Sequence, residues 1–96
     1  MAQHRISCGA LVLRDQKILL VRHLRPGVHD FWSAPGGGVE GSEELARTAE
    51  RETFEETAIH VAAARLAYID EGWSEQRRVL SFWFLADYIS GEIDIG

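Results

Sequence analysis

Residues 37–59 read GGVEGSEELARTAERETFEETAI and contain the clearest helix signal in the chain. Ser42 follows a glycine and is predicted to be the N-cap, because its hydroxyl can accept a bond from a free backbone N–H of the first turn. Glu43 and Glu44 would then lie in that first turn, where the positive end of the helix dipole favours acids. From there to Thr57 the segment has neither Gly nor Pro, so we expect a helix that continues to about Thr57.

Three carboxylates recur at helical spacing near the end of this segment. Glu52, Glu55 and Glu56 stand at relative positions 0, +3 and +4, which places them on one narrow face of the helix. Like charges so close repel one another unless they point freely into water or hold a cation. Magnesium and similar hard cations take oxygen ligands, so a metal site is one interpretation. The other is a solvated acidic face with intrahelical ion pairs.

Small residues form a second stripe on the same helix. Ala46, Ala49 and Thr53 lie at helical spacing and are suited to close packing on a sheet. The carboxylate face adjoins this stripe, so we expect the acids near a packed edge. Along the helix, Arg51 can reach Glu55 four residues after it, and Arg47 can reach Glu43 four residues before it.

Two sets of residues carry a family resemblance. The charged and glycine positions of the segment resemble the Nudix box of the Nudix hydrolases, in the order Gly37, Glu43, Arg51, Glu52, Glu55, Glu56 and Ile59. Just upstream, Trp32, Pro35 and Gly36 resemble the family's lead-in to the box. Every charged position of the motif is matched at its spacing, which makes the signal far more specific than a lone glycine-rich triplet.

Two positions depart from the family motif. Thr53 stands where an aliphatic residue is usual, and we expect its hydroxyl to be satisfied locally so that packing survives. Ala58 stands where Gly is usual. Because Gly just past a helix end commonly adopts the left-handed conformation, Ala58 either carries strain of about 1 kcal/mol or more, or the helix ends differently.

Length and composition limit the classes of protein. Ninety-six residues make one domain, and the net charge of −5 disfavours a nucleic-acid groove held by charge alone. Cys8 is the only cysteine, so no internal disulfide can form and its expected role is that of a small buried hydrophobe. No run is long enough for a membrane span and no signal peptide precedes the domain, so a cytoplasmic location is expected.

The remaining segments predict a sheet. Strands are expected at residues 6–13, 17–23, 31–34, 59–69 and 77–89, and a further strand is expected to begin within 92–95. Residues 14–16 would close a hairpin, and loops or turns are expected at 23–30, 35–38 and 70–76. Apolar residues on both sides of the 77–89 strand indicate an inner strand. Gly9 marks a bulge or a close approach within the first strand.

Order and spacing predict an α+β fold with a mixed sheet and one packed helix. By resemblance this is the αβα sandwich of the Nudix fold, which lacks here the C-terminal helix that usually covers the second sheet face. Residues 1–96 are therefore expected to form a single Nudix-like domain that is incomplete at its C-terminus. The alternative is that a second copy of the chain covers that face as a homodimer.

The resemblance also implies a chemistry. Nudix enzymes use a divalent metal to hydrolyse the pyrophosphate bond of a nucleoside diphosphate linked to another moiety. It implies that Glu52, Glu55 and Glu56 hold magnesium, with manganese as the alternative, and that Gly36 or Gly37 adds a carbonyl oxygen. Glu52 is then a ligand or the general base.

Other residues receive narrower roles. Arg51 is expected to orient the carboxylates, and Glu71 and Glu75 are candidate bases from a later loop. Arg25 and Trp32 are candidate contacts to a small nucleotide substrate, although an exposed loop arginine and a core or rim aromatic are the alternatives. The particular substrate stays open.

One rival function comes from another class. A Nudix-fold module can sense a nucleotide without cleaving it, but such proteins tend to lose acids of the box. This chain keeps them all, which favours an enzyme.

Overall fold

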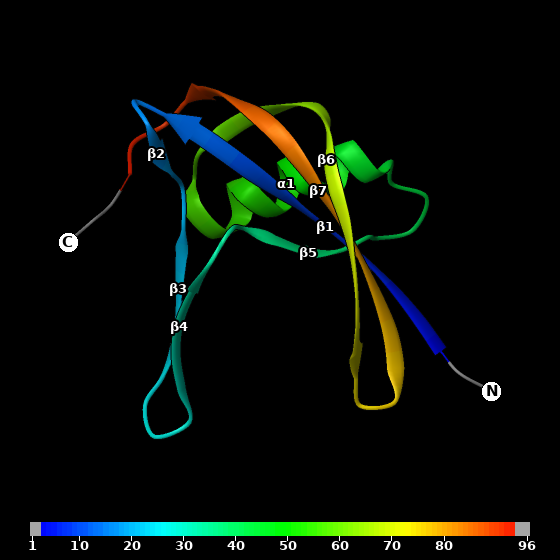
Figure 1. The fold of residues 1–96 in the computed structure, drawn as a ribbon. Helices are drawn as coiled ribbons and strands as arrows, with labels where there is room; N and C mark the ends of the chain where they lie inside the picture. Colours follow the sequence, from blue (N-terminus) through cyan, green and yellow to red (C-terminus); the bar gives the residue numbers. More distant parts are fainter. Residues whose placement is uncertain (1–2, 94–96) are drawn as a thin grey trace.

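A computed structural model describes residues 3–93, in which one helix lies against a mixed sheet (Figure 1). The helix is α1 (Leu45–Thr57). The strands are β1 (Gln3–Arg14), β2 (Lys17–Ile18), β3 (Val21–Arg25), β4 (His29–Ser33), β5 (Gly36–Gly38), β6 (His60–Ser74) and β7 (Arg77–Ser90).

Strand β1 organises the main sheet. One of its edges pairs in parallel with β7, from Gln3 opposite Arg77 to Val12 opposite Ala86. Its other edge pairs with β2 and β5, both antiparallel, and β6 adds antiparallel to the far side of β7. The sheet is therefore mixed and β7 is an inner strand, which confirms both predictions. β3 and β4 form a separate two-stranded sheet.

The core lies between the main sheet and α1, and apart from Ile59 most of its buried side chains are small. Alternate residues of β1, Cys8, Ala10 and Val12, are buried on the face that α1 covers. From the helix, Ala49 and Thr53 are fully buried, so the small-residue stripe does pack on the sheet. Burial raises the pKa of the Cys8 thiol to about 11, with the charge of Glu43 adding to the rise. Cys8 is thus a protonated core residue, as predicted.

The opposite face of the sheet carries aromatic side chains. The ring of Trp83 lies over Gly9, where an added Cβ would come within 2.4 Å of it. Trp83 also stacks on Tyr68, with ring centroids 6.3 Å apart. Gly9 therefore marks a close approach, the second of the two predicted outcomes. Within residues 3–93, α1 is the only helix and lies on the other face (Figure 1). Coverage by a second copy stays a prediction.

The prediction of a polar loop at 23–30 was only partly right: residues 26–28 form a turn, but the rest of the segment belongs to strands β3 and β4. Arg22, which lies opposite Trp32, reaches diagonally across the two strands to Asp30 and forms a bidentate ion pair with both bonds at 2.8 Å. The ring of His23 stacks on Phe31 at 4.8 Å. Such cross-strand pairs stabilise a hairpin even where each strand alone looks too polar.

Two further turns were placed wrongly. Residues 36–38 form β5 and not a turn, because their backbone pairs with the free edge of β1. Likewise, residues 70–74 belong to β6, and only Glu75 and Gln76 form the turn into β7. Both have positive φ, 51° and 64°, as a two-residue hairpin turn requires. Of the strand expected at 92–95, residues 92 and 93 are not in a strand, and the rest lies outside the described residues.

Candidate active site

The helix begins later than its sequence suggests. Its N-cap is Glu44, with φ −70° and ψ 148°, and no side chain caps the first turn. Ser42 lies before the helix, so the predicted N-cap and the acidic first turn were wrong. The reason is that Glu43 is engaged elsewhere: the hydroxyl of Thr48 donates to it at 2.6 Å. Arg47 pairs with Glu50 and not with Glu43.

Arg51 is the centre of the polar network beside α1. Its Nε and Nη2 donate to the two carboxylate oxygens of Glu43 at 2.7 and 3.0 Å. Its Nη1 reaches Glu52 at 2.9 Å and Glu55 at 3.1 Å. Its Nη2 also donates to the carbonyl oxygen of Gly38 at 3.0 Å. One guanidinium thus ties the glycine strand, the loop before the helix and two of the three carboxylates together.

This network sets the charge state of Glu43. The hydrogen bonds from Arg51, then those from Thr48 and the backbone N–H of Glu40, lower the pKa of Glu43 from 4.5 to about 2. The same carboxylate raises the already high pKa of Arg51. Glu43 is therefore ionised at any ordinary pH and holds the loop against the helix.

Two carboxylates of α1 also contact the glycines of β5. Glu52 lies directly under Gly37, so closely that a Cβ there would be 2.5 Å from its carboxylate carbon. Glu56 accepts a hydrogen bond from the backbone N–H of Gly36 at 3.0 Å. The glycines therefore permit the helix carboxylates to approach the strand backbone, because no side chain stands between them.

Glu56 differs electrostatically from the other acids. Burial raises the pKa of its carboxyl, the charges of Glu52 and Glu55 add to the rise, and the N–H of Gly36 opposes it. A cation bound beside it would reverse this effect by favouring the ionised form.

The carboxylate face offers oxygen donors to a divalent metal. Carboxylate oxygens are ligands that magnesium prefers, so the donor chemistry of Glu52, Glu55 and Glu56 fits. Across residues 3–93, however, no three His, Cys, Asp or Glu side chains converge in an arrangement that could hold a metal ion. Arg51 bonds Glu52 and Glu55 instead. Glu55 is 54% exposed in its side chain, which leaves it room to turn.

Of the two helix endings predicted at Ala58, the structure has the strained one. Ala58 has φ 60° and ψ 18°, the left-handed conformation, and its N–H donates to the carbonyl of Phe54 at 2.8 Å. Thr53 donates its hydroxyl to the carbonyl of Ala49 at 2.7 Å, which confirms that it is satisfied locally.

The secondary candidates lie on the two hairpins. Arg25 is exposed at the end of β3, opposite His29. Glu71 is in β6 and pairs with Arg78 at 3.2 Å, and Glu75 is in the exposed turn after it. No described hydrogen bond or ion pair links any of these side chains to the carboxylates of α1.

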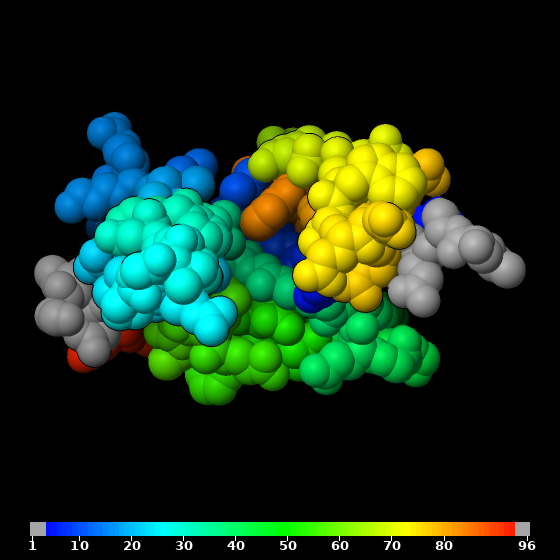
Figure 2. Space-filling view, turned by 90° about the horizontal axis from the view of Figure 1, so that it is seen from below, coloured from blue at the N-terminus to red at the C-terminus, as the bar shows by residue number. Residues whose placement is uncertain are grey.

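Figure 2 shows a hollow between the β3–β4 hairpin in cyan and the tip of the β6–β7 hairpin in yellow, with α1 in green along one side. Separately, a cavity of about 440 Å³ is lined by His4, Arg5, Ile6, Gly38, Val39 and Arg77. Sequence reasoning missed its two arginines, because Arg5 and Arg77 meet only through the parallel pairing of β1 with β7.

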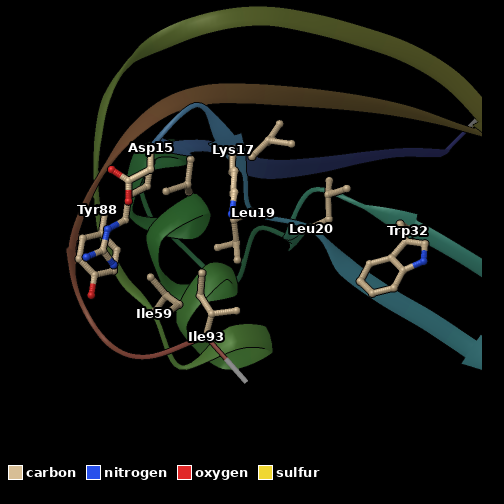
Figure 3. A pocket seen from close by; sticks show the side chains of 11 residues that line it. Asp15, Lys17, Leu19, Leu20, Trp32, Ile59, Tyr88 and Ile93 are labelled. Atoms are coloured by element: carbon tan, nitrogen blue, oxygen red, sulfur yellow. The ribbon is translucent and has the colours of Figure 1, made fainter. Parts of the chain in front are cut away.

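A second cavity, of about 490 Å³, lies beside the C-terminal end of α1 and is mainly apolar. Figure 3 shows Ile59, Leu19 and Ile93 meeting there and Trp32 standing apart on β4. Trp32 is 60% exposed, and the guanidinium of Arg22 lies 6.0 Å from its ring. Its ring is thus at the rim of this apolar cavity, and no hydrogen bond of the described residues joins it to the carboxylates.

Known structures share this arrangement of helix and sheet. A MutT NUDIX hydrolase from Burkholderia pseudomallei superposes with a TM-score of 0.84 and is 32% identical, covering 96% of this chain and 73% of that one. The family model for the NUDIX domain matches residues 3–96. The chain therefore belongs to the NUDIX domain family.

Curated relatives include two named enzymes. An NAD-capped RNA hydrolase NudC from Actinobacillus succinogenes is 37% identical over 95 residues, covering 92% of this chain and 35% of that protein. An ADP-ribose pyrophosphatase from Methanocaldococcus jannaschii is 28% identical over 93 residues, covering 95% of this chain and 55% of that protein. The chain thus spans about a third of the first relative and about half of the second. Within residues 3–93, no helix has the length and apolar character needed to cross a membrane.

Proposed function

We propose that this chain is a metal-dependent hydrolase that cleaves the pyrophosphate bond of a nucleoside diphosphate linked to another moiety. One observation carries the proposal: Arg51 holds Glu52 and Glu55 beside Glu56, on the helix face that contacts the glycines of β5. A solvated acidic face could also have the pair between Arg51 and Glu55, but it would need no contact with the glycines of β5. The family membership supports the same activity.

Glu52, Glu55 and Glu56 would hold the ion, which we propose to be magnesium or manganese. A carbonyl oxygen of Gly36 or Gly37 would complete the donor set. When bound, the ion would neutralise phosphate oxygens and lower the pKa of a water molecule.

The chain's own residues then provide position and charge. Arg51 is a positioning residue, because its guanidinium fixes Glu52 and Glu55 relative to β5. Glu52 would act as a ligand or as the general base that takes a proton from the attacking water. Glu71 and Glu75 are the alternative bases, which the β6–β7 hairpin would have to bring to the substrate.

The substrate class follows from the names of the relatives. NAD-capped RNA and ADP-ribose each contain a pyrophosphate that joins a nucleoside to another group. We propose this class of small nucleotide derivative for the present chain. At the carboxylate face, the binding of substrate phosphates would depend on cations, because Glu52, Glu55 and Glu56 would otherwise repel them.

The test compares Glu56→Gln with Glu44→Gln, an exposed glutamate on the approach to the same helix. Glu56→Gln keeps the shape but removes a charge, so turnover with magnesium should fall by at least about 10–100-fold. Its metal-free melting temperature should rise slightly, because clustered like charges repel in the native state. Wild type should gain about 2.7 kcal/mol of stability at free magnesium a hundredfold above the Kd, and Glu56→Gln should gain much less. Glu44→Gln should match wild type throughout.

Unchanged turnover in Glu56→Gln, together with melts that do not respond to magnesium in either protein, would disprove the metal site. Saturable binding of ADP-ribose by wild type without hydrolysis would instead favour the nucleotide-sensing module, the rival function for this fold.

A further inference from the structure

The cavity of about 440 Å³ is basic in an acidic chain. Arg5 and Arg77 line it together with His4, and its other walls are Ile6 and the backbone at Gly38 and Val39. No carboxylate of the described residues forms an ion pair with either arginine, although most other arginines of the chain have one. Two uncompensated guanidinium groups around one hollow favour an anionic ligand.

The sheet places both arginines on the same side. Arg77 pairs with Gln3 in the parallel register of β1 with β7, two residues before Arg5. Because side chains alternate across a strand, Arg5 and Arg77 project from the same face of the sheet. The pairing of two separate strands thus makes the cluster, and neither strand contains it alone.

The cavity adjoins the carboxylate network through a single residue. An added Cβ at Gly38 would lie 3.3 Å from Nη2 of Arg5, so the guanidinium packs beside this glycine. The carbonyl oxygen of Gly38 accepts the bond from Arg51, whose guanidinium holds Glu52. Gly38 therefore separates the basic cavity from the site proposed for the pyrophosphate.

We infer that Arg5 and Arg77 form an anion site for a phosphate group that the substrate carries beyond its scissile pyrophosphate. The inference rests on the proposed function and names its substrate class more closely: compounds with a third phosphate. That phosphate is either the terminal phosphate of a nucleoside triphosphate or a 3′-phosphodiester that follows the nucleoside. ADP-ribose, with two phosphates only, leaves the site empty.

Kinetics on matched substrates test the inference. Arg5→Gln and Arg77→Gln are compared with Arg65→Gln, which removes an exposed arginine of β6 outside the cavity. ATP and an NAD-capped dinucleotide are the two substrates that carry a third phosphate. On whichever of them uses the site, the two cavity variants should lose about tenfold in kcat/KM through a higher KM. With ADP-ribose they should stay within about twofold of wild type, as Arg65→Gln should on all three. The substrate that shows the loss identifies the source of the phosphate.

A binding measurement keeps the inference separate from catalysis. Inorganic phosphate is titrated into the metal-free protein while the amide NMR signals of Gly38 and Val39 are followed. Saturable shifts are expected in wild type and in Glu56→Gln, and their loss is expected in Arg5→Gln and Arg77→Gln.

Two results would overturn the inference: an equal fall in kcat/KM on all three substrates, or amide shifts that are absent or equally reduced in Arg65→Gln. Phosphate binding without hydrolysis of any substrate would support the anion site and overturn the proposed function.

Discussion

Replacing Ala58 by Gly should stabilise the protein. Ala58 is exposed and left-handed, with φ 60° and ψ 18°, and its N–H closes the last bond of α1 to Phe54. A Cβ in this conformation crowds the neighbouring carbonyl, whereas Gly adopts it freely. Because the methyl group is exposed, its removal should cost little packing.

The magnitude follows from two opposing terms. The left-handed conformation costs about 1–2 kcal/mol for a residue with a Cβ. Gly has more freedom in the unfolded chain, which offsets about 0.4–1 kcal/mol of that relief. The net gain should be about 0.5–1 kcal/mol, or about 2–8 °C in melting temperature for a domain of this size.

The assay is thermal and urea unfolding of Ala58→Gly beside Ala46→Gly. Ala46 is the second residue of the same helix, has negative φ and is half-buried, so the same substitution there should destabilise by about 1 kcal/mol through lost helix propensity together with some packing. A gain at position 58 beside a loss at position 46 would indicate that the left-handed backbone of Ala58 carries strain. A loss of stability in Ala58→Gly would refute the reasoning, and would mean that the methyl group makes contacts that outweigh its strain.

Two further predictions concern the glycine strand and the acid network. Gly37→Ala should reduce turnover and lower stability, because its Cβ would clash with the Glu52 carboxylate that Arg51 holds. Gly36→Ala should destabilise more strongly, because its Cβ would meet strand backbone at 2.9 Å. Melts and turnover of both variants check this, and equal destabilisation would contradict it. Arg51 is the main cause of the low pKa of Glu43, which falls from 4.5 to about 2. The ionised Glu43 should therefore stabilise the fold fully above pH 4.5, and this contribution should shrink as the pH falls toward 2. Urea unfolding at pH 6 and pH 3 gives the free energy of unfolding of wild type and of Glu43→Gln. The difference between the two proteins should be smaller at pH 3, and a difference that does not change with pH would contradict this prediction.

Local patterns along the chain were enough for much of the helix. The spacing of Ala49 and Thr53 predicted the buried face, and the hydroxyl of Thr53 bonds one turn back, as its β-branched side chain allows. The unusual Ala58 predicted a strained exit, and it is left-handed. These features depend on residues within one or two turns, so the information lies in the sequence nearby.

Features that depend on distant partners were missed. Glu43 would suit a first helical turn, but Arg51 eight residues later draws it out of the helix. Residues 36–38 look like a flexible turn, yet the free edge of β1 makes them a strand. In each case a hydrogen bond to a remote residue outweighs a local preference of about 1 kcal/mol or less.

The basic cavity is the clearest case of this kind. Nothing near Arg5 or Arg77 in the sequence marks either residue, and their strands are separated by most of the chain. Only the parallel register of β1 with β7 brings them to one face, beside the backbone of Gly38. Helical spacing could therefore predict the carboxylate face, because one element carries it, whereas the neighbouring cations required the sheet to assemble.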